Sequence, residues 1–338
     1  MCLYPKLMRN KRYTEGGPIP SDERLLYTPI KCNNCKQCNK QKADAWRKRL
    51  IDELTINKTK AYFVLLTYST ESLLEIHSSI NKELKGYNVD NAIYTLSVRR
   101  FLDRWTKKHG KSLRHWLINE LGQQKTEHMH IHGIIWTEQP FDEVRKIWKY
   151  GLVFPSKDRV KENYVNQQSI SYIMKYVTKI DPKHKYFKPV ILTSYGMGNV
   201  NRISNYERLK DVYKDKDGIE SQLPMYYRRK IYSDDQREQL WLKKLDEGVR
   251  YISGRKIPNW NTELINKLLK QEQKDSEADG FIGDKWNWID SKHEQEQREL
   301  LRQARYKSKI TRILVDSEGN KFALLKGKLL NYKNEKLC

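Results

Sequence analysis

The sequence has no long apolar run, few cysteines and a shortage of acidic residues. No stretch approaches the roughly 20 apolar residues that cross a bilayer, and the beginning, MCLYPKLMRNKRY, lacks the continuous apolar core of a secretory signal. The cysteines number five in 338 residues, and three of them crowd into one short segment, which does not suit a disulfide framework. We therefore expect a cytosolic protein with reduced or metal-bound thiols and no membrane partner.

Basic side chains greatly outnumber acidic ones. The chain carries 65 Lys and Arg against 42 Asp and Glu, a formal net charge of +23, and 11% of its residues are aromatic. A positive excess favours a polyanionic partner, and aromatic rings can stack on bases, although some proteins are cationic for solubility alone. The composition predicts a folded protein that binds nucleic acid.

Strand and helix patterns interleave along much of the chain. Residues 61–68, AYFVLLTY, predict a buried strand, and residues 116–136 predict two strands around the polar turn GQQKTE. Helical patterns cover KQKADAWRKRLIDEL, residues 93–109, FDEVRKIWKYG and residues 169–180. Because the central strands are joined by a hairpin, we expect an α+β fold whose central, mainly antiparallel sheet is flanked by helices.

Composition divides the chain into three predicted parts. Residues 1–58 hold a cysteine-rich segment, irregular up to residue 40, and a basic helix. Residues 59–204 contain the predicted sheet. Residues 205–338 are polar, and from residue 259 they are rich in Lys, Glu, Gln and Leu, which is typical of surface helices on an accessory region.

Three histidines alternate with apolar residues in HMHIHGII. On a strand, His128, His130 and His132 share one face, and imidazoles two residues apart can bind one metal ion if that face lines a cleft. Glu120, on the preceding strand of the hairpin, is the expected third ligand, and His128 competes for that role. A carboxylate beside imidazoles suits magnesium or manganese. The alternative is a polar outer face that is rich in histidine.

Two tyrosines and two lysines share one helix face in YIMKYVTK. Tyr172, Lys175, Tyr176 and Lys179 recur at three- and four-residue steps, which places them in a sector about 100° wide. A phenol with an unperturbed pKa of about 10 attacks a phosphodiester only with help from a nearby cation or metal ion. An exposed amphipathic helix can carry the same residues, but the preceding histidine strand favours phosphotyrosyl transfer.

With KCNNCKQC, FVLLTY and NELG in the same order, these motifs make the chain resemble the HUH endonuclease superfamily. The resemblance is closer to the replication initiators of microvirus single-stranded DNA phages, particularly the gokushovirus-like branch, and extends from residue 1 to residue 198. It implies an HUH-type nuclease domain over residues 59–204. The histidines precede the tyrosines, which is typical of an initiator rather than a conjugative relaxase.

The resemblance also implies roles for individual residues. His130, His132 and Glu120 match the metal ligands of the family, and Tyr172 and Tyr176 match its two nucleophiles. Other matches are the accompanying lysines and the end of the first strand motif, a structural and DNA-positioning element: Lys175, Lys179, Thr67 and Tyr68. The extra histidine, His128, departs from the family pattern and allows two registers of the paired motif. The later register is preferred because GII follows it.

The mechanism implied by the resemblance is rolling-circle initiation. A metal ion polarises the scissile phosphate, one tyrosine attacks, and a 5′-phosphotyrosine link forms beside a free 3′-hydroxyl that primes synthesis. The second tyrosine later cleaves the regenerated junction, and the released 3′-end reseals the circle. The implied partners are single-stranded DNA at the phage origin and a host helicase or polymerase, in the cytoplasm of the bacterial host.

Two further sets of residues are candidate binding sites. Cys32, Cys35 and Cys38 are spaced for a shared metal, and Cys2 can supply the fourth thiolate of a tetrahedral zinc site, with free thiols as the alternative. The basic face of residues 93–109 offers DNA contacts, with a solvated surface as the default explanation: Arg99, Arg100 and Arg104.

Three rival functions remain open at this point. A non-catalytic protein that coats single-stranded nucleic acid would use the same basic helices and rings. A plasmid initiator or transposase of the same superfamily would share the motifs, although the amino-terminal cysteines argue against it. A hydrolytic zinc site is the third, but no HExxH-type helix is present.

Overall fold

The computed structural model divides the chain into two compact units. Unit 1 comprises Met1–Ile56 and Gly198–Trp286, and unit 2 comprises Asn57–Met197 and Asn287–Cys338. The structure describes residues 2–14, 16–123, 127–160, 163–199, 212–214, 220–253, 255–309, 312–315, 321–325 and 328–331. No helix within these ranges has the length and apolar character of a membrane span.

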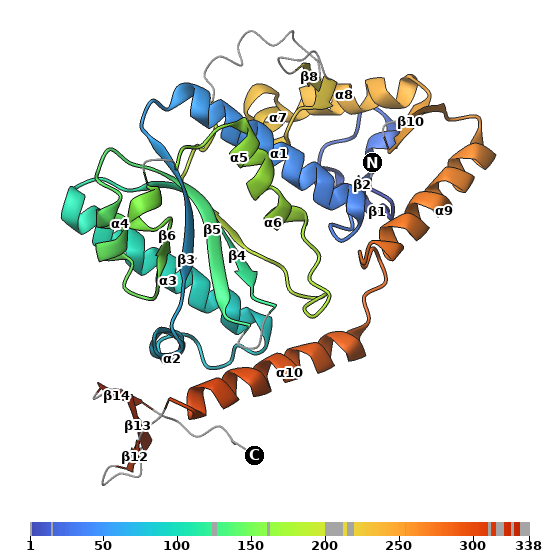
Figure 1. Cartoon of the computed structure of the whole chain (residues 1–338). Helices are drawn as coiled ribbons and strands as arrows, with labels where there is room; N and C mark the ends of the chain where they lie inside the picture. Colours follow the sequence, from blue (N-terminus) through green and yellow to red (C-terminus); the bar gives the residue numbers. More distant parts are fainter. Residues whose placement is uncertain are drawn as a thin grey trace. The chain divides into compact units, whose positions relative to one another are not determined.

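A five-stranded sheet forms the centre of unit 2 (Figure 1). Its order is β6-β3-β5-β4-β7, and every neighbouring pair is antiparallel. The predicted α+β fold with an antiparallel central sheet is therefore confirmed. The strands are β3 (Ala61–Thr67), β4 (Arg114–Leu121), β5 (Met129–Trp136), β6 (Val153–Phe154) and β7 (Ile191–Thr193).

Helices cover both faces of this sheet. Helix α3 packs its Val98 and Phe101 into the same core as Val64, Leu66 and Ile131 of the strands. Helices α5 and α6 lie on the opposite face (Figure 1). The helices of unit 2 are α2 (Thr70–His77), α3 (Tyr87–His109), α4 (Asp142–Ile147), η3 (Lys157–Arg159), α5 (Gln167–Ile173), α6 (Lys175–Thr178) and α10 (Trp288–Lys307).

The alternation of β5 decides which of its residues reach which helix layer. Met129 and Ile131 face the α3 core, so His130 and His132 point to the face on which α5 and α6 lie. A Cβ atom on Gly133 would lie 2.4 Å from the Trp116 carbonyl oxygen, so only glycine fits in this row. The hairpin register thus fixes the histidines on one side.

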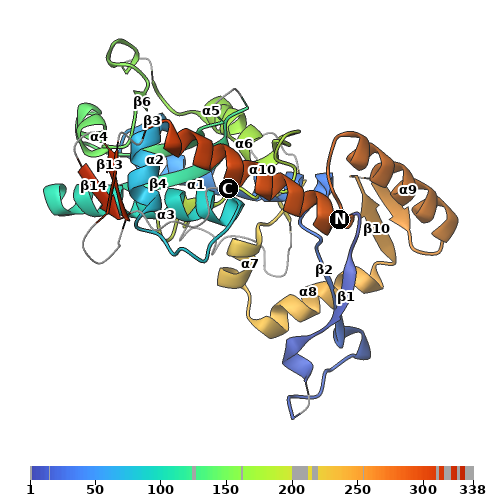
Figure 2. The same ribbon diagram turned by 90° about the horizontal axis from the view of Figure 1, so that it is seen from below.

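Helix α10 belongs to unit 2 and runs beside α2 (Figure 2). Its Arg298 and Arg302 are buried, and both donate to the buried carboxylate of Asp90 on α3. A three-stranded antiparallel sheet follows in the same unit: β12 (Arg312–Val315), β13 (Lys321–Leu325) and β14 (Lys328–Asn331). A helix late in the chain is therefore integrated with the central sheet domain.

Unit 1 is built around the long helix α1 (Lys36–Ile56). The segment before it, predicted to be irregular, contains an antiparallel ladder that pairs Lys6 with Ile30. The other elements are β1 (Lys6–Arg9), η1 (Lys11–Tyr13), η2 (Glu23–Leu25), β2 (Tyr27–Ile30), β8 (Val212–Lys214), β9 (Glu220–Gln222), α7 (Met225–Ile231), α8 (Asp234–Asp246), β10 (Val249–Ile252), β11 (Arg255–Pro258) and α9 (Thr262–Ala278).

The helix predicted over residues 169–180 is interrupted. Met174 separates α5 from α6, and α6 ends at Thr178, before Asp181 and Pro182. The Met174 amide still donates to the Ile170 carbonyl, so the interruption is slight. Tyr172 and Tyr176 thus come from two consecutive short helices rather than from one.

Candidate active site

The hairpin of β4 and β5 brings a carboxylate to the histidines. Glu120 pairs with His130 across the ladder, and His132 lies two residues further along the same face. His132 Nε2 donates to Glu120 Oε2 over 2.9 Å. The predicted acidic partner on the preceding strand therefore contacts one of the two predicted histidine ligands.

Lys179 also pairs with Glu120. Its Nζ contacts Oε1 of the carboxylate, whose side chain is only 17% exposed. Burial raises the pKa of Glu120, but hydrogen bonds from His132 and Lys179 outweigh that effect and hold it below its ordinary value. The site therefore holds an ionised carboxylate between an imidazole and an ammonium group.

Tyr176 lies flat against His132. The two ring centroids are 3.8 Å apart at an interplanar angle of 13°, and the Tyr172 hydroxyl oxygen is 3.3 Å from that of Tyr176. The Tyr172 ring is 49% exposed, and Lys175 Nζ lies 4.9 Å from its centroid. Despite the interruption at Met174, both phenol oxygens reach one spot beside the histidine strand.

The phenol of Tyr176 is held in its protonated form. Burial, the hydrogen bond with Tyr172 and the charge of Glu120 all raise the pKa of Tyr176. A nucleophilic role therefore requires an additional positive charge or a base at the moment of attack.

The other two histidines are kept neutral. Burial and the neighbouring His132 lower the pKa of His130, and burial with nearby Arg305 lowers the pKa of His128. His128 Nε2 lies 3.2 Å from the Thr70 hydroxyl. Neutral imidazole is the form that binds metal ions.

The donor set suits a divalent cation. When the Nε2 proton of His132 points to Glu120, the lone pair lies on Nδ1, and this buried atom has no hydrogen-bond partner in the described part of the chain. A lone pair of this kind, beside an ionised carboxylate, is what a metal ion satisfies. However, the ligand atoms of His130, His132 and Glu120 do not all lie within 4.8 Å of one another, so metal binding would require them to draw together.

The predicted DNA contacts occupy different environments. Thr67 Oγ1 accepts a hydrogen bond from the Leu152 amide and so connects β3 to β6. Tyr68 is buried against Trp148, and its role in positioning DNA stays a prediction.

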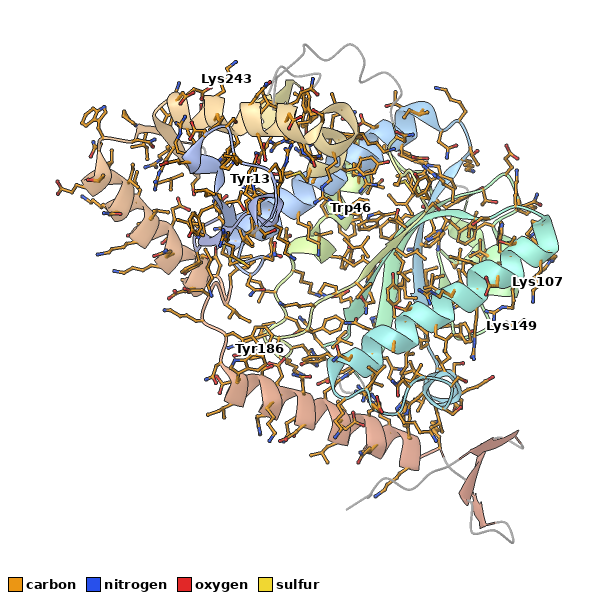
Figure 3. All side chains as sticks on the ribbon, turned by 180° about the vertical axis from the view of Figure 1, so that it is seen from behind. Tyr13, Trp46, Lys107, Lys149, Tyr186 and Lys243 are labelled. Carbon is orange, nitrogen blue, oxygen red and sulfur yellow. The ribbon has the colours of Figure 1, made fainter. Side chains whose placement is uncertain are left out.

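The three predicted basic contacts lie on α3, the helix that covers the sheet face away from the tyrosines. Arg99 is exposed, whereas Arg104 donates to the Ile147 carbonyl and the Tyr150 hydroxyl. Arg100 is half-buried. Figure 3 shows α3 in front of the sheet, with the exposed Lys107 near its C-terminal end.

A group of charges that the motifs do not reveal supports the histidine strand. Glu127, directly before His128, accepts a hydrogen bond from His184 Nε2 over 3.1 Å, and its carbonyl accepts one from Arg298. Asp181 Oδ2 lies 2.7 Å from Nδ1 of the same histidine. No sequence pattern signals this group, because its members lie far apart in the chain.

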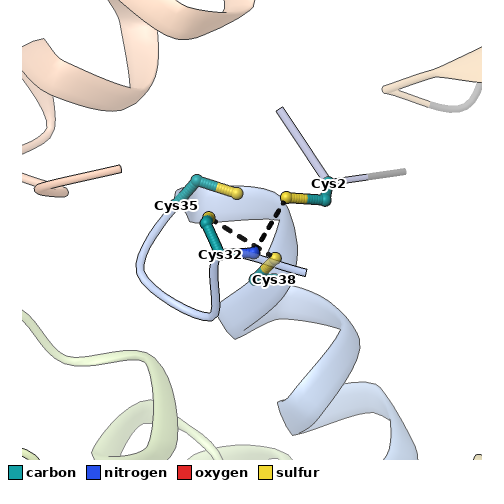
Figure 4. A group of neighbouring side chains, drawn as sticks. All are labelled: Cys2, Cys32, Cys35 and Cys38. Carbon is teal, nitrogen blue, oxygen red and sulfur yellow. Dashed lines mark hydrogen bonds between the residues drawn. The ribbon is translucent and has the colours of Figure 1, made fainter. Parts of the chain in front are cut away.

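Four cysteine sulfurs gather in unit 1 (Figure 4). The Sγ atoms of Cys2, Cys32, Cys35 and Cys38 all lie within 4.8 Å of one another, and Cys2 Sγ accepts a hydrogen bond from the Cys32 amide. A hydrogen bond from Cys38 lowers the pKa of Cys35 to about 4 despite burial, so the cluster favours a thiolate. The predicted grouping of these cysteines is confirmed, and it could hold a metal ion.

Comparison with known proteins gives one family match. Residues 61–181 match the model of a family of replication-associated proteins, the ORF2 type. This stretch begins at β3 and ends just after α6, so it contains the histidine strand and both tyrosines. No curated protein and no solved structure gives a significant match. The family match supports a replication initiator that binds DNA.

Proposed function

We propose that this protein is an HUH-type endonuclease that initiates rolling-circle replication by nicking and rejoining single-stranded DNA. The observation that carries the proposal is the position of Tyr176, flat on His132, with the hydroxyl of Tyr172 3.3 Å from its own. An exposed structural helix has no reason to place two phenols over a histidine and a buried carboxylate. The replication-associated family match over the same residues agrees with it.

Each side chain takes one role in the proposed reaction. His130, His132 and Glu120 hold a magnesium or manganese ion, which when bound polarises the scissile phosphate. A tyrosine phenolate attacks phosphorus, the bond from phosphorus to the 3′-oxygen breaks, and that oxygen leaves as a hydroxyl after gaining a proton. Lys175, 4.9 Å from the Tyr172 ring centroid, supplies positive charge for the phenolate.

Two tyrosines allow the second cleavage that ends a round of replication. Because their hydroxyl oxygens are 3.3 Å apart, either phenol can reach a phosphorus atom placed beside the other. One tyrosine holds the 5′-end while the other cleaves the regenerated junction, and the free 3′-hydroxyl then attacks the first phosphotyrosine and closes the circle. No nucleotide is consumed because each phosphotyrosine keeps the energy of the broken bond.

The proposal is tested by trapping the covalent adduct. The full-length protein is incubated with manganese and single-stranded oligonucleotides that tile the cognate genome, and adducts that survive denaturation are counted. We expect Tyr172→Phe and Tyr176→Phe each to keep some adduct, and the double variant to lose it by a factor of about 1,000 or more, the scale of a lost nucleophile. Tyr164→Phe, an exposed tyrosine just before α5, serves as the matched control.

Two outcomes would contradict the proposal. An adduct that persists in the double variant excludes these tyrosines as nucleophiles. Tight binding without any adduct, in every metal tested, identifies the protein instead as a non-catalytic single-strand binder. We further propose that the DNA is a microvirus origin replicated in the cytoplasm of a bacterial host with its helicase or polymerase.

The cysteine cluster is proposed to be a structural zinc site. Four sulfurs within 4.8 Å of one another match the ligand number of tetrahedral zinc, and three of the four cysteines are buried. The site lies in unit 1, whereas the histidines and tyrosines lie in unit 2. We therefore assign it a role in folding and none in the nicking reaction.

A further inference from the structure

The carboxylate of Glu120 already holds a cation, the ammonium group of Lys179. The two oxygens divide their partners, with Oε2 on His132 and Oε1 on Lys179. Glu120 is mostly shielded from water, while the Lys179 side chain is 39% exposed at the edge of the site. A shielded carboxylate needs a positive partner, and in this structure the lysine supplies it.

Lys179 is placed to leave this position without disturbing the tyrosines. It is the residue after α6 and has extended backbone angles, so its side chain is not part of a helical turn. Lys175, in the first position of α6, lies instead over the Tyr172 ring. The two lysines, so alike in the sequence, therefore occupy different electrostatic environments.

We propose that Lys179 is a placeholder for the catalytic ion. It neutralises Glu120 while the divalent cation is absent, and it is displaced when the cation binds. This inference rests on the proposed function, because it requires Glu120 to be a metal ligand. An ammonium group and a divalent ion repel each other strongly at contact distance in a shielded site, so the two compete for the carboxylate.

Displacement changes where the positive charge of Lys179 acts. Once released from Glu120, the ammonium group stays tethered to the end of the helix that carries Tyr176. There it is free to pair with an anionic phosphate of the DNA strand. Lys179 thus acts as a positioning residue that couples ion binding to the arrival of a phosphate.

Competition makes a specific prediction about metal affinity. Removing the ammonium group removes the competitor, so Lys179→Met should bind manganese about tenfold more tightly than wild type. Lys179→Arg keeps the charge and should return the affinity to the wild-type value or weaken it. Lys175→Met is the matched control and should bind as wild type does.

The experiment titrates Mn²⁺ alone into the full-length proteins and follows free aqueous Mn²⁺ by electron paramagnetic resonance. His132→Ala and Glu120→Gln identify the site, because both should lose the binding. In chelator, Lys179→Met should melt below Lys175→Met, since Glu120 has lost its partner, and saturating Mn²⁺ should close that gap.

The outcomes separate this inference from the proposed function. If Lys179→Met binds Mn²⁺ no more tightly than wild type while His132→Ala loses binding, the placeholder role is wrong and the ion site stands. If wild type binds no Mn²⁺, or binds it equally well in His132→Ala and Glu120→Gln, both the ion site and the placeholder role are wrong.

Discussion

His184 shows how a single side chain can stabilise the entrance to the histidine strand. It is 5% exposed and lies between two carboxylates, Asp181 and Glu127. Burial lowers its pKa, but the hydrogen bond with Asp181 outweighs burial, and the net pKa is raised. Because Glu127 directly precedes His128, an imidazolium here fixes the end of β5 from outside the active site.

The raised pKa of His184 predicts a pH-dependent contribution to stability. A folded-state pKa above the unfolded value of about 6.5 means that the contribution is complete below pH 6.5 and is lost as the pH rises through the folded pKa. We expect His184→Gln to lower the free energy of unfolding by about 1–3 kcal/mol at pH 6 and by less at pH 8.5. Urea unfolding at several pH values measures this difference.

The control for this prediction is His293→Gln, because His293 is an exposed histidine on α10 in the same unit. It should change stability little at either pH. A deficit of His184→Gln that grows with rising pH would contradict the charged state that we assign to His184.

The sequence could predict the residue types of the candidate site but not all of their partners. Alternation in HMHIHGII predicts a shared face for His130 and His132, and the four-residue step predicts neighbouring tyrosines. The pairing of Lys179 with Glu120 could not be predicted, because it depends on where α6 ends and on how it lies against β4. Local patterns carry no such distances.

At the scale of elements, α10 holds the central domain through arginines. Arg298 makes two hydrogen bonds to Asp90, of 3.0 and 3.1 Å, and a third to the Glu127 carbonyl. Arg302 adds bonds to Asp90 and to the Gly86 carbonyl. Both arginine side chains are almost completely buried, so the hydrogen bonds offset the cost of removing these charges from water.

Breaking this group should destabilise unit 2 and loosen the histidine strand. Arg298→Met leaves Asp90 with Arg302 alone and removes a donor from Glu127, and we expect a loss of about 3–5 kcal/mol in the free energy of unfolding. Hydrogen exchange should rise at residues 127–132. Lys292→Met, on an exposed turn of α10, is the control and should cost under about 0.5 kcal/mol. Equal effects of the two substitutions would rule out the proposed support.

Sequence patterns predicted the central elements better than they predicted α10. The strands at residues 61–68 and 116–136 have strong apolar content and a polar turn, so their existence and pairing follow from local physics. In α10, the buried residues include Arg298 and Arg302, and a sequence rich in Lys, Glu and Gln looks like a solvated surface. Charges that are buried in pairs leave no apolar stripe to detect.

At the scale of the whole molecule, the chain leaves unit 1 and returns to it. Residues 1–56 and 198–286 form one unit, and the central sheet domain lies between them in the sequence. Within unit 1, Cys2 and the segment from Cys32 to Cys38 share a core with Leu269 of α9. The proposed zinc ion would therefore connect segments that are far apart in the chain, a connection that composition alone does not show.

This organisation predicts that zinc removal acts on one unit. Ligating thiolates contribute binding energy directly to folding, about 10–16 kcal/mol in isolated zinc-finger peptides. Treatment with a zinc-selective chelator, or Cys35→Ser, should speed hydrogen exchange about tenfold or more around Cys2, Cys32 and α9, and leave β3, β4 and β5 protected. Cys338→Ser, at a cysteine outside the described residues, is the control and should retain one zinc per chain by elemental analysis.

Two results would change this assignment of the cysteine cluster. Protein that contains no zinc when purified without chelator, with exchange unchanged in Cys35→Ser, would mean that the four thiols pack without a metal. If the central strands lose protection together with unit 1, the two units depend on each other for stability, and the metal supports the nuclease domain as well.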